Sequence, residues 1–159
     1  MRARHNTGWS AFEHAAPDLA AAGRRLLTGK DGVAIGFLAT VSATQVLHLA
    51  PVCPIFRAGS LYLSAGGPTP KTADLRAAKR YVLHALLGAH DEEFQVAGHA
   101  TEVLDAGERA SVHAAIRFGA FNRADPVFHL HVERALWVYW ERVGQPDTKP
   151  TRRRWSARR

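Results

Sequence analysis

Residues 46–64 have the sequence VLHLAPVCPIFRAGSLYLS, and this stretch decides the fold class. Its last five residues, 60–64, alternate polar and apolar side chains, as a strand with one buried face does. The preceding part, 46–56, is apolar and extended, but its two prolines cannot donate to a ladder. We therefore expect that strand to be bent, bulged or partly unpaired. The short connection at 57–59 contains a glycine, which favours a β-hairpin.

Other segments extend this hairpin into a larger sheet. Four of them have the length and apolar content of strands, namely 32–41, 81–86, 93–104 and 126–140. For 81–86, continuation of the preceding helix is the alternative. Capping residues and helical spacing predict helices over 10–28, from Thr69 or Thr72 to about 79, and from 105 to about 118. The strands follow one another without regular β-α-β alternation, which favours a six-stranded antiparallel barrel with added helices.

Capping motifs mark where two of the helices begin. Ser10 with Glu13, and Asp105 with Glu108, each place a capping side chain three residues before a glutamate. We expect both to begin a helix. In the long strand 93–104, Gly98 stands where a barrel bend or a close neighbour requires the absence of a side chain.

Length and composition restrict the class of protein. A chain of 159 residues with 47% hydrophobic and 22% charged residues forms one globular domain. No apolar run approaches the ~20 residues of a membrane span, and no signal peptide is visible. The single cysteine, Cys53, excludes an internal disulfide and zinc sites built from two or more cysteines. We expect a cytoplasmic protein without a membrane partner.

The net charge of +7 is concentrated at the C-terminus. Six positive charges and no acidic residue lie within 149–159, so residues 1–148 carry a net charge of only +1. We therefore divide the chain into a domain, 1–148, and a basic C-terminal tail, 149–159, whose removal should leave the fold intact. A nearly neutral body argues against a nucleic-acid partner, because DNA-binding domains usually carry a basic face.

Four segments together resemble a known family. They are the opening helix that leads into GFLATV (36–41), the hairpin described above, TPKTADLRAAKRYVLH (69–84), and DEEFQVAGHATEVLD (91–105) followed by VFHLHVERALWVYW (127–140). In order and spacing, over residues 9–141, they are similar to the pyridoxamine 5′-phosphate oxidase-like FMN-binding split barrels. The resemblance implies a mainly β, α+β fold, a six-stranded antiparallel split barrel with flanking helices.

The resemblance also implies a function. It points to an FMN-binding flavoprotein, a flavin-dependent oxidoreductase that acts on an unknown small molecule, with the flavin at the interface of a homodimer. In this class the flavin carries out the hydride chemistry and the protein orients it. Two alternatives remain within the fold: a reductase that uses the deazaflavin coenzyme F420, and a non-catalytic flavin- or haem-binding module.

Lys71 has a chemical reason to bind a phosphate. A helix N-terminus presents unpaired N–H groups, to which a lysine adds a charge and threonines add hydroxyl groups. Thr69 and Thr72 supply those hydroxyls where a helix is expected to begin. The resemblance implies that Lys71 binds the FMN phosphate. From the residues alone, a solvated lysine is the alternative.

Further cofactor contacts follow from the resemblance. It places the flavin ring along the backbone of Ala50, Val52 and Cys53, and the ribityl chain near the hydroxyl of Ser64. Glu93 falls near the place where the oxidase has a glutamine that contacts the ring from the partner subunit, so a carboxylate replaces the donor to a flavin carbonyl. Plain barrel core for Val52 and Cys53, and a turn hydroxyl for Ser64, are the alternatives.

The histidines and the C-terminal tryptophan complete the candidates. His48, on the bent strand, is placed to polarise a flavin or substrate group, or to pair with the backbone. His129 and His131 share one strand face, which we interpret as a polar outer face and not as a metal site. Trp155 and its neighbouring arginines form either a lid over the flavin, a solvated tail or a weak nucleic-acid contact. The oxidase's closing motif is absent from the C-terminus, which argues against pyridoxine phosphate oxidation.

Overall fold

The computed structural model describes residues 8–119 and 121–157. Its helices are α1 (Trp9–Ala15), α2 (Pro17–Leu27), α3 (Pro70–Ala77) and α4 (Ala106–Ala114), with a 3-10 turn η1 (Ala89–Asp91). Its strands are β1 (Gly36–Val41), β2 (Leu47–Val52), β3 (Ile55–Arg57), β4 (Ser60–Ser64), β5 (Arg80–Ala85), β6 (Glu93–Glu102), β7 (Val127–Glu141) and β8 (Lys149–Ser156).

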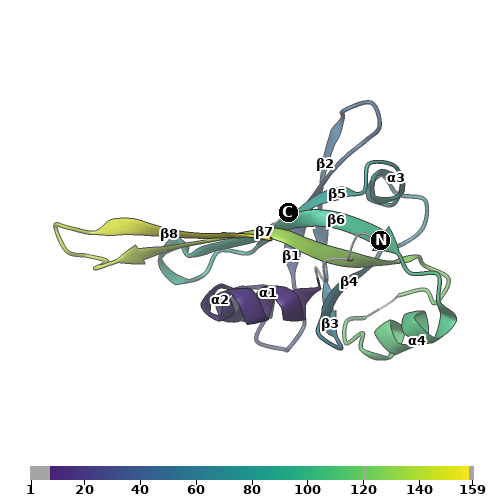
Figure 1. The fold of residues 1–159 in the computed structure, drawn as a ribbon, viewed down its shortest axis with the longest axis horizontal. Coiled ribbons are helices and arrows are strands. Elements are labelled where there is room, and N and C mark those ends of the chain that lie inside the picture. Colours follow the sequence, from purple (N-terminus) through teal and green to yellow (C-terminus); the bar gives the residue numbers. More distant parts are fainter. Residues whose placement is uncertain (1–7, 120, 158–159) are drawn as a thin grey trace.

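The strands form one antiparallel sheet that curls into a half-barrel flanked by the four helices (Figure 1). Their order is β2-β1-β5-β6-β7-β4-β3, and β8 pairs with the C-terminal half of β7. The predicted mainly β, α+β class is confirmed. In Figure 1 the β7–β8 hairpin projects to the left, away from α3 and α4 on the right. None of the described helices is long and apolar enough to cross a membrane.

The sheet has eight strands where the sequence predicted six. The expected strand 46–56 is interrupted at Cys53-Pro54, so β2 and β3 are separate strands with different partners: β2 pairs with β1, and β3 with β4. Proline has no N–H to donate, and here the ladder changes partner at Pro54. The second additional strand is β8, in the segment expected to be a tail.

Residues 149–156 belong to the sheet, so a domain boundary at 148 does not separate them from the fold. The ring of Trp155 lies 4.9 Å from that of Phe12 and packs against the main core. Arg153 pairs with Asp18 of α2 at 3.2 Å and lies over the ring of Trp137. Removal of this segment would take away one strand of the sheet and a ring that packs on the core.

The two capping motifs have different outcomes. Asp105 accepts a hydrogen bond from the backbone N–H of Glu108 at 2.7 Å, which confirms the predicted start of α4. Ser10 does not begin the first helix: Gly8 is its N-cap, and the N–H of Ser10 donates to the carbonyl of Gly59 in the β3–β4 turn at 2.8 Å. That bond ties the first helical turn to the hairpin, so the tertiary contact replaces the local cap.

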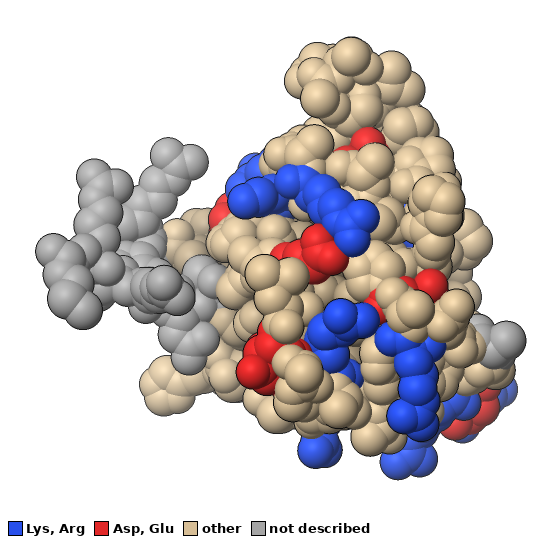
Figure 2. All heavy atoms as spheres, turned by 90° about the vertical axis from the view of Figure 1, so that its right-hand side faces the viewer, with Lys and Arg blue, Asp and Glu red and all other residues tan. Residues whose placement is uncertain are grey.

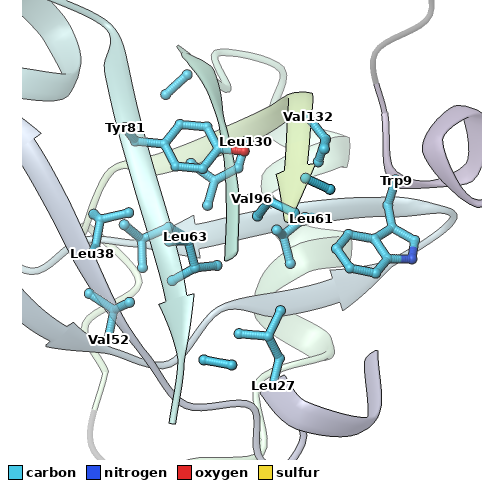
Figure 3. Packing of buried hydrophobic residues seen from close by; sticks show 14 of the residues in the cluster. Trp9, Leu27, Leu38, Val52, Leu61, Leu63, Tyr81, Val96, Leu130 and Val132 are labelled. Atoms are coloured by element: carbon cyan, nitrogen blue, oxygen red, sulfur yellow. The ribbon is translucent and has the colours of Figure 1, made fainter. Parts of the chain in front are cut away.

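The main core fills the space between the curved sheet and helices α1 and α2. Figure 3 shows Leu38, Leu63, Tyr81 and Leu130, from four different strands, converging in this interior. At the α1 end, Trp9 is fully buried and packs edge-on against two other aromatic rings. Truncating a buried aromatic of this size typically costs about 3–5 kcal/mol, so α1 is firmly attached to the sheet.

Charges on the face that carries α3 and α4 are mixed. Figure 2 shows Lys and Arg side chains beside Asp and Glu side chains there, separated by uncharged surface. One such pair joins Arg76 of α3 to Glu102 of β6, with two nitrogen–oxygen contacts of 2.7 and 2.8 Å. The charges on this face therefore do not form a continuous basic surface.

The histidines of β6 and β7 form a stacked row on the outer side of the sheet. The ring of His131 lies 4.4 Å from His99 and 4.1 Å from His129, and His129 lies 5.0 Å from Tyr62. Glu133 bonds His99 at one end, and Glu108 accepts from the hydroxyl of Tyr62 at the other. Within the described residues, no group of three or more His, Cys, Asp or Glu side chains is arranged to hold a metal ion.

Burial makes the charged forms of His129 and His131 unfavourable. Burial, with the neighbouring imidazoles of His129 and His99, lowers the pKa of His131 to about 4. Burial also lowers the pKa of His129. Both residues therefore favour the neutral imidazole, whose flat rings stack without mutual repulsion.

Gly98 gives a stability prediction. The β6–β7 ladder shifts register between Ala97 and Gly98, and a Cβ on Gly98 would lie 1.8 Å from the carbonyl oxygen of His131. We expect Gly98→Ala to lower the free energy of unfolding by about 3 kcal/mol or more, measured by chemical denaturation. Gly119→Ala is the control, because its Cβ would meet nothing within 4 Å. Similar losses in both variants would contradict the close approach at the bulge.

His131 gives a pH prediction. Because its pKa is lower in the folded chain, its contribution to stability is present above pH ~6.5 and is lost as the pH falls toward 4. We expect His131→Gln to reduce the loss of unfolding free energy between pH 7 and pH 4.5 by about 1–2 kcal/mol, allowing for solvent screening. Denaturation at both pH values measures it, with His14→Gln, an exposed histidine of α1, as control. An unchanged pH dependence in the His131 variant would contradict the prediction.

Candidate functional site

Two open clefts meet at Lys71. Cleft A has a volume of about 250 Å³, and cleft B about 310 Å³. Lys71 lines both of them. The other residues of cleft A are Ile35, Pro51, Val52, Cys53, Leu63, Ser64, Gly66 and Phe118, and those of cleft B are Leu38, Thr40, Leu47, His48, Leu49, Ala50, Thr69 and Pro70. Seven of the candidates, including Thr69, lie on this continuous surface.

Strand β2 positions most of those candidates by its two-residue period. His48, Ala50 and Val52 alternate with more exposed residues, so they share the inner side of the strand. His48 and Ala50 then line cleft B, and Val52 lines cleft A. The break after β2 adds Cys53 to cleft A. Burial, followed by the negative charge of Asp31, raises the pKa of that thiol, which therefore stays protonated and poorly nucleophilic.

Helix α3 brings Lys71 to the junction of the clefts. Pro70 is the first residue of the helix and Lys71 the second, so the lysine stands where backbone N–H groups lack intrahelical partners. Thr69 precedes the helix and lines cleft B. Thr72 is buried, its hydroxyl 3.0 Å from that of Thr69, and it lines neither cleft. Thr72 can therefore support Thr69 but is not placed to touch a ligand itself.

Ser64 carries an unsatisfied polar group at the floor of cleft A. Its Oγ atom is buried and has no hydrogen-bond partner among the described residues. An unpaired buried hydroxyl costs roughly 1–3 kcal/mol, so native proteins keep few of them. Because Ser64 lines cleft A, a rotation of its side chain would turn this hydroxyl toward a ligand there, which is the contact expected of a ribityl chain.

A buried hydrogen-bonded junction lies behind cleft B. The Oδ2 atom of Asp74 accepts a hydrogen bond from the hydroxyl of Thr40 at 2.6 Å and lies 2.7 Å from Nδ1 of His48. The Asp74 side chain is only 4% exposed, against 34% for His48. Thr40 and His48 face each other across the β1–β2 ladder, so one carboxylate links two strands to α3.

Two of the residues that the sequence offered as candidates, Glu93 and Trp155, lie outside both clefts in the folded chain. Glu93 begins β6 opposite Val138 and lines neither cleft. Trp155 packs on the core and, with Arg154, borders a separate cleft of about 430 Å³ on the sheet. That cleft shares no lining residue with A or B. Within one subunit, Trp155 is therefore placed as a core residue and not as a lid over Lys71.

Sequence reasoning missed Asp74 and Thr40. Asp74 lies in α3, and the structure turns its carboxylate toward Thr40 and His48. The three-residue spacing between Lys71 and Asp74 was a weak signal that both belong to the site. Phe118 follows α4 and borders cleft A. Nothing in the sequence indicates that it belongs to the site, because its position depends on how the chain returns from α4 to the sheet.

Comparisons with known proteins agree on the fold. No family model and no curated protein matches the sequence. An FMN-binding protein from Syntrophomonas wolfei is similar in structure, with a TM-score of 0.61 and 15% identity over 82% of this chain and 93% of that one. A protein from Listeria innocua described as a pyridoxamine 5′-phosphate oxidase has a TM-score of 0.51 and 16% identity, over 64% of this chain and 85% of that one.

A haem-binding protein from Mycobacterium smegmatis is also similar, with a TM-score of 0.53 and 20% identity over 74% of this chain. This chain spans about half of that protein's length, 52%. Proteins that bind different cofactors therefore share this architecture. The chain has the split-barrel fold of the pyridoxamine 5′-phosphate oxidase-like and FMN-binding proteins, as the sequence resemblance predicted.

Proposed function

We propose that the chain is a flavoprotein that binds FMN across clefts A and B and acts as a flavin-dependent oxidoreductase on a small molecule. The observation that carries the proposal is the position of Lys71, a cation at a helix N-terminus where two clefts of suitable chemistry meet. The fold is shared with an FMN-binding protein, which supports the same assignment.

The residues present fit the parts of FMN. Lys71 and Thr69 offer charge and a hydroxyl to the phosphate, with His48 on the same cleft. Ser64 offers its unpaired hydroxyl to the ribityl chain, and Val52 gives cleft A an apolar wall for the ring. The buried Ser64 hydroxyl is the most specific of these features, because it is a polar atom that lacks a partner until a ligand arrives.

When bound, the flavin supplies the hydride transfer, and the chain supplies position and electrostatics. Lys71 and the α3 N-terminus hold the anionic end, Ser64 fixes the chain that leads from it, and the neutral Cys53 thiol leaves the neighbouring surface uncharged. Neither cleft holds a nucleophile paired with a base, so binding and orientation are the roles these residues perform.

Haem binding is the second candidate function. It is favoured by one specific observation, an imidazole on the cleft surface, together with the haem-binding neighbour of the same fold. The coenzyme F420 also carries a phosphate for Lys71. Absorption spectra separate the three cofactors, because bound FMN gives two visible bands, F420 one band near the violet, and haem an intense Soret band. An FMN spectrum after reconstitution would support the proposal, and a stable haem complex without flavin binding would overturn it.

We also propose that two copies of this chain complete the site as a homodimer. Strand β2 is an edge of the sheet, and its outward residues Leu47 and Leu49 are 79% and 70% exposed. Phe37 of β1 adds to the same outer face. Exposed apolar side chains on an edge strand promote aggregation unless a partner covers them. Leu47 and Leu49 also border cleft B, so a second copy there would close the open side of the site.

The phosphate assignment predicts a ligand-selective effect of Lys71→Ala. Loss of a charge-assisted phosphate contact should weaken FMN binding about ten- to a hundredfold, measured by flavin fluorescence quenching. Riboflavin has the same ring and ribityl chain but no phosphate, so its affinity should change little. Arg152→Ala, an exposed arginine on β8, is the matched loss of charge elsewhere. Equal losses for FMN and riboflavin would remove Lys71 from the phosphate site.

The dimer predicts a mass of twice 17.4 kDa in sedimentation at micromolar concentration. Leu49→Asp should shift the protein to monomer and weaken FMN binding together, because a buried carboxylate at the interface costs several kcal/mol. Leu104→Asp changes a leucine that is 83% exposed and outside both clefts, and should leave a dimer. A stable monomer in the unaltered protein would count against both the interface and the shared site.

A further inference from the structure

We propose that His48 and Asp74 couple the binding of an anionic group in cleft B to the uptake of a proton on His48. The inference rests on the proposed phosphate site and adds a property to it, namely that affinity for the phosphate depends on pH through one identified imidazole. Asp74 acts as a positioning residue, and His48 is the group that contacts the ligand.

The charged side chains near cleft B differ in whether a ligand can reach them. His48, Thr40 and Lys71 all line cleft B, but Asp74 does not. Its carboxylate is buried behind His48, 2.7 Å from Nδ1 of the imidazole. A ligand in the cleft therefore faces the two basic side chains directly, while the acid acts on it only through the imidazole.

A hydrogen-bonded junction fixes the orientation of the imidazole of His48. Asp74 and Thr40 come from α3 and β1, and their hydrogen bond fixes the carboxylate against which Nδ1 of His48 rests. When Nδ1 carries a proton that it donates to Asp74, Nε2 is the ring nitrogen left for a ligand. Protonation of Nε2 turns that atom from an acceptor into a donor, and only a donor can bind a phosphate oxygen.

Two side chains of opposite charge lie near His48. Strand β2 packs on β1 and α3, and the charged side chains that these elements bring to His48 are Asp74 and Lys71. Asp74 holds a negative charge against the ring, and Lys71 holds a positive charge in the same cleft. A phosphate between Lys71 and His48 would add negative charge beside the imidazole, which favours the protonated form of an imidazole. Because imidazole changes its charge between pH 5 and 8, this balance shifts near neutrality.

Thermodynamic linkage makes the effect reciprocal. If binding of the anion favours the proton on His48, then lowering the pH must tighten binding of the anion by the same coupling. A phosphate monoester also gains a proton near pH 6, which acts in the opposite direction. The contribution of His48 is therefore the difference between the unaltered protein and a variant whose side chain cannot titrate.

The experiment is calorimetry of FMN binding at pH 7 in buffers of different ionisation enthalpy, which counts the protons taken up. We expect net proton uptake with FMN and none with riboflavin, which lacks the phosphate. His48→Gln keeps a neutral donor at the place of Nε2 and should abolish the uptake. Asp74→Asn keeps the shape of the junction without its charge and should reduce it. His84→Gln, a half-buried histidine of β5 outside both clefts, should behave like the unaltered protein.

Affinity gives a second readout. Between pH 8 and pH 6.5, FMN binding should tighten about three- to tenfold more in the unaltered protein than in His48→Gln. A merely structural role for His48 would weaken binding equally at both pH values. Proton uptake that is the same in His48→Gln as in the unaltered protein would overturn the proposal, even if FMN binds tightly.

A probe that is not a flavin separates failure of the proton coupling from failure of the flavin assignment. The imidazole resonance of His48 can be followed by NMR during a pH titration with and without inorganic phosphate. A titration midpoint that rises with phosphate supports the coupling whether or not FMN binds. A midpoint that phosphate leaves unchanged overturns it, and absence of FMN binding alone overturns only the proposed function.

Discussion

The pairing of β6 with β7 is the constraint on which the rest of the molecule depends. β7 has β6 on one side along most of its length, and on the other side it pairs first with β4 and then with β8. The β6–β7 ladder shifts register at Gly98, where a side chain would meet the backbone of His131. Bulges bend a strand and increase its twist, and this one lies where the sheet must curl around its core.

The site inherits its geometry from that sheet. Pairing of β4 with the first residues of β7 places Ser64 at one edge of the half-barrel, and α3 follows directly from there. Helix α3 then packs back on β1, where its Asp74 bonds Thr40. The junction at Asp74 thus holds the helix that carries Lys71 against the strand that carries His48. A movement of either element would separate the two basic side chains that face cleft B.

Burial of an acid behind a base is the electrostatic principle of this site. A carboxylate exposed in the cleft would repel a phosphate, whereas the same carboxylate behind an imidazole orients that ring and favours its charged form. The stacked row of His99, His129 and His131 shows the opposite arrangement. There each imidazole lies against another, and burial lowers the pKa of His129 and of His131.

The sequence by itself determined the elements whose signals are local. The alternation over 60–64 predicted β4 with its bounds, Asp105 predicted the start of α4, and the position of Lys71 at a helix N-terminus needed only its neighbours. The resemblance gave the split-barrel fold, which the structure confirms, and seven of the candidates lie together at clefts A and B. The strand and the two helix starts depend on residues within one strand or one turn of each other, whereas the resemblance depends on the order and spacing of segments over 9–141.

Only the tertiary structure decided what depends on partners distant in the chain. Pro54 predicts a break in the strand, but it does not predict that β2 and β3 pair with different strands. The basic composition of 149–156 does not indicate a strand, because that strand forms only by pairing with β7. Asp74 could not be assigned, because its partners Thr40 and His48 are 34 and 26 residues away. The sequence does not show which charged side chains will face a ligand. The fold buries some of them, and burial decides which charged groups act on a ligand and which act on each other.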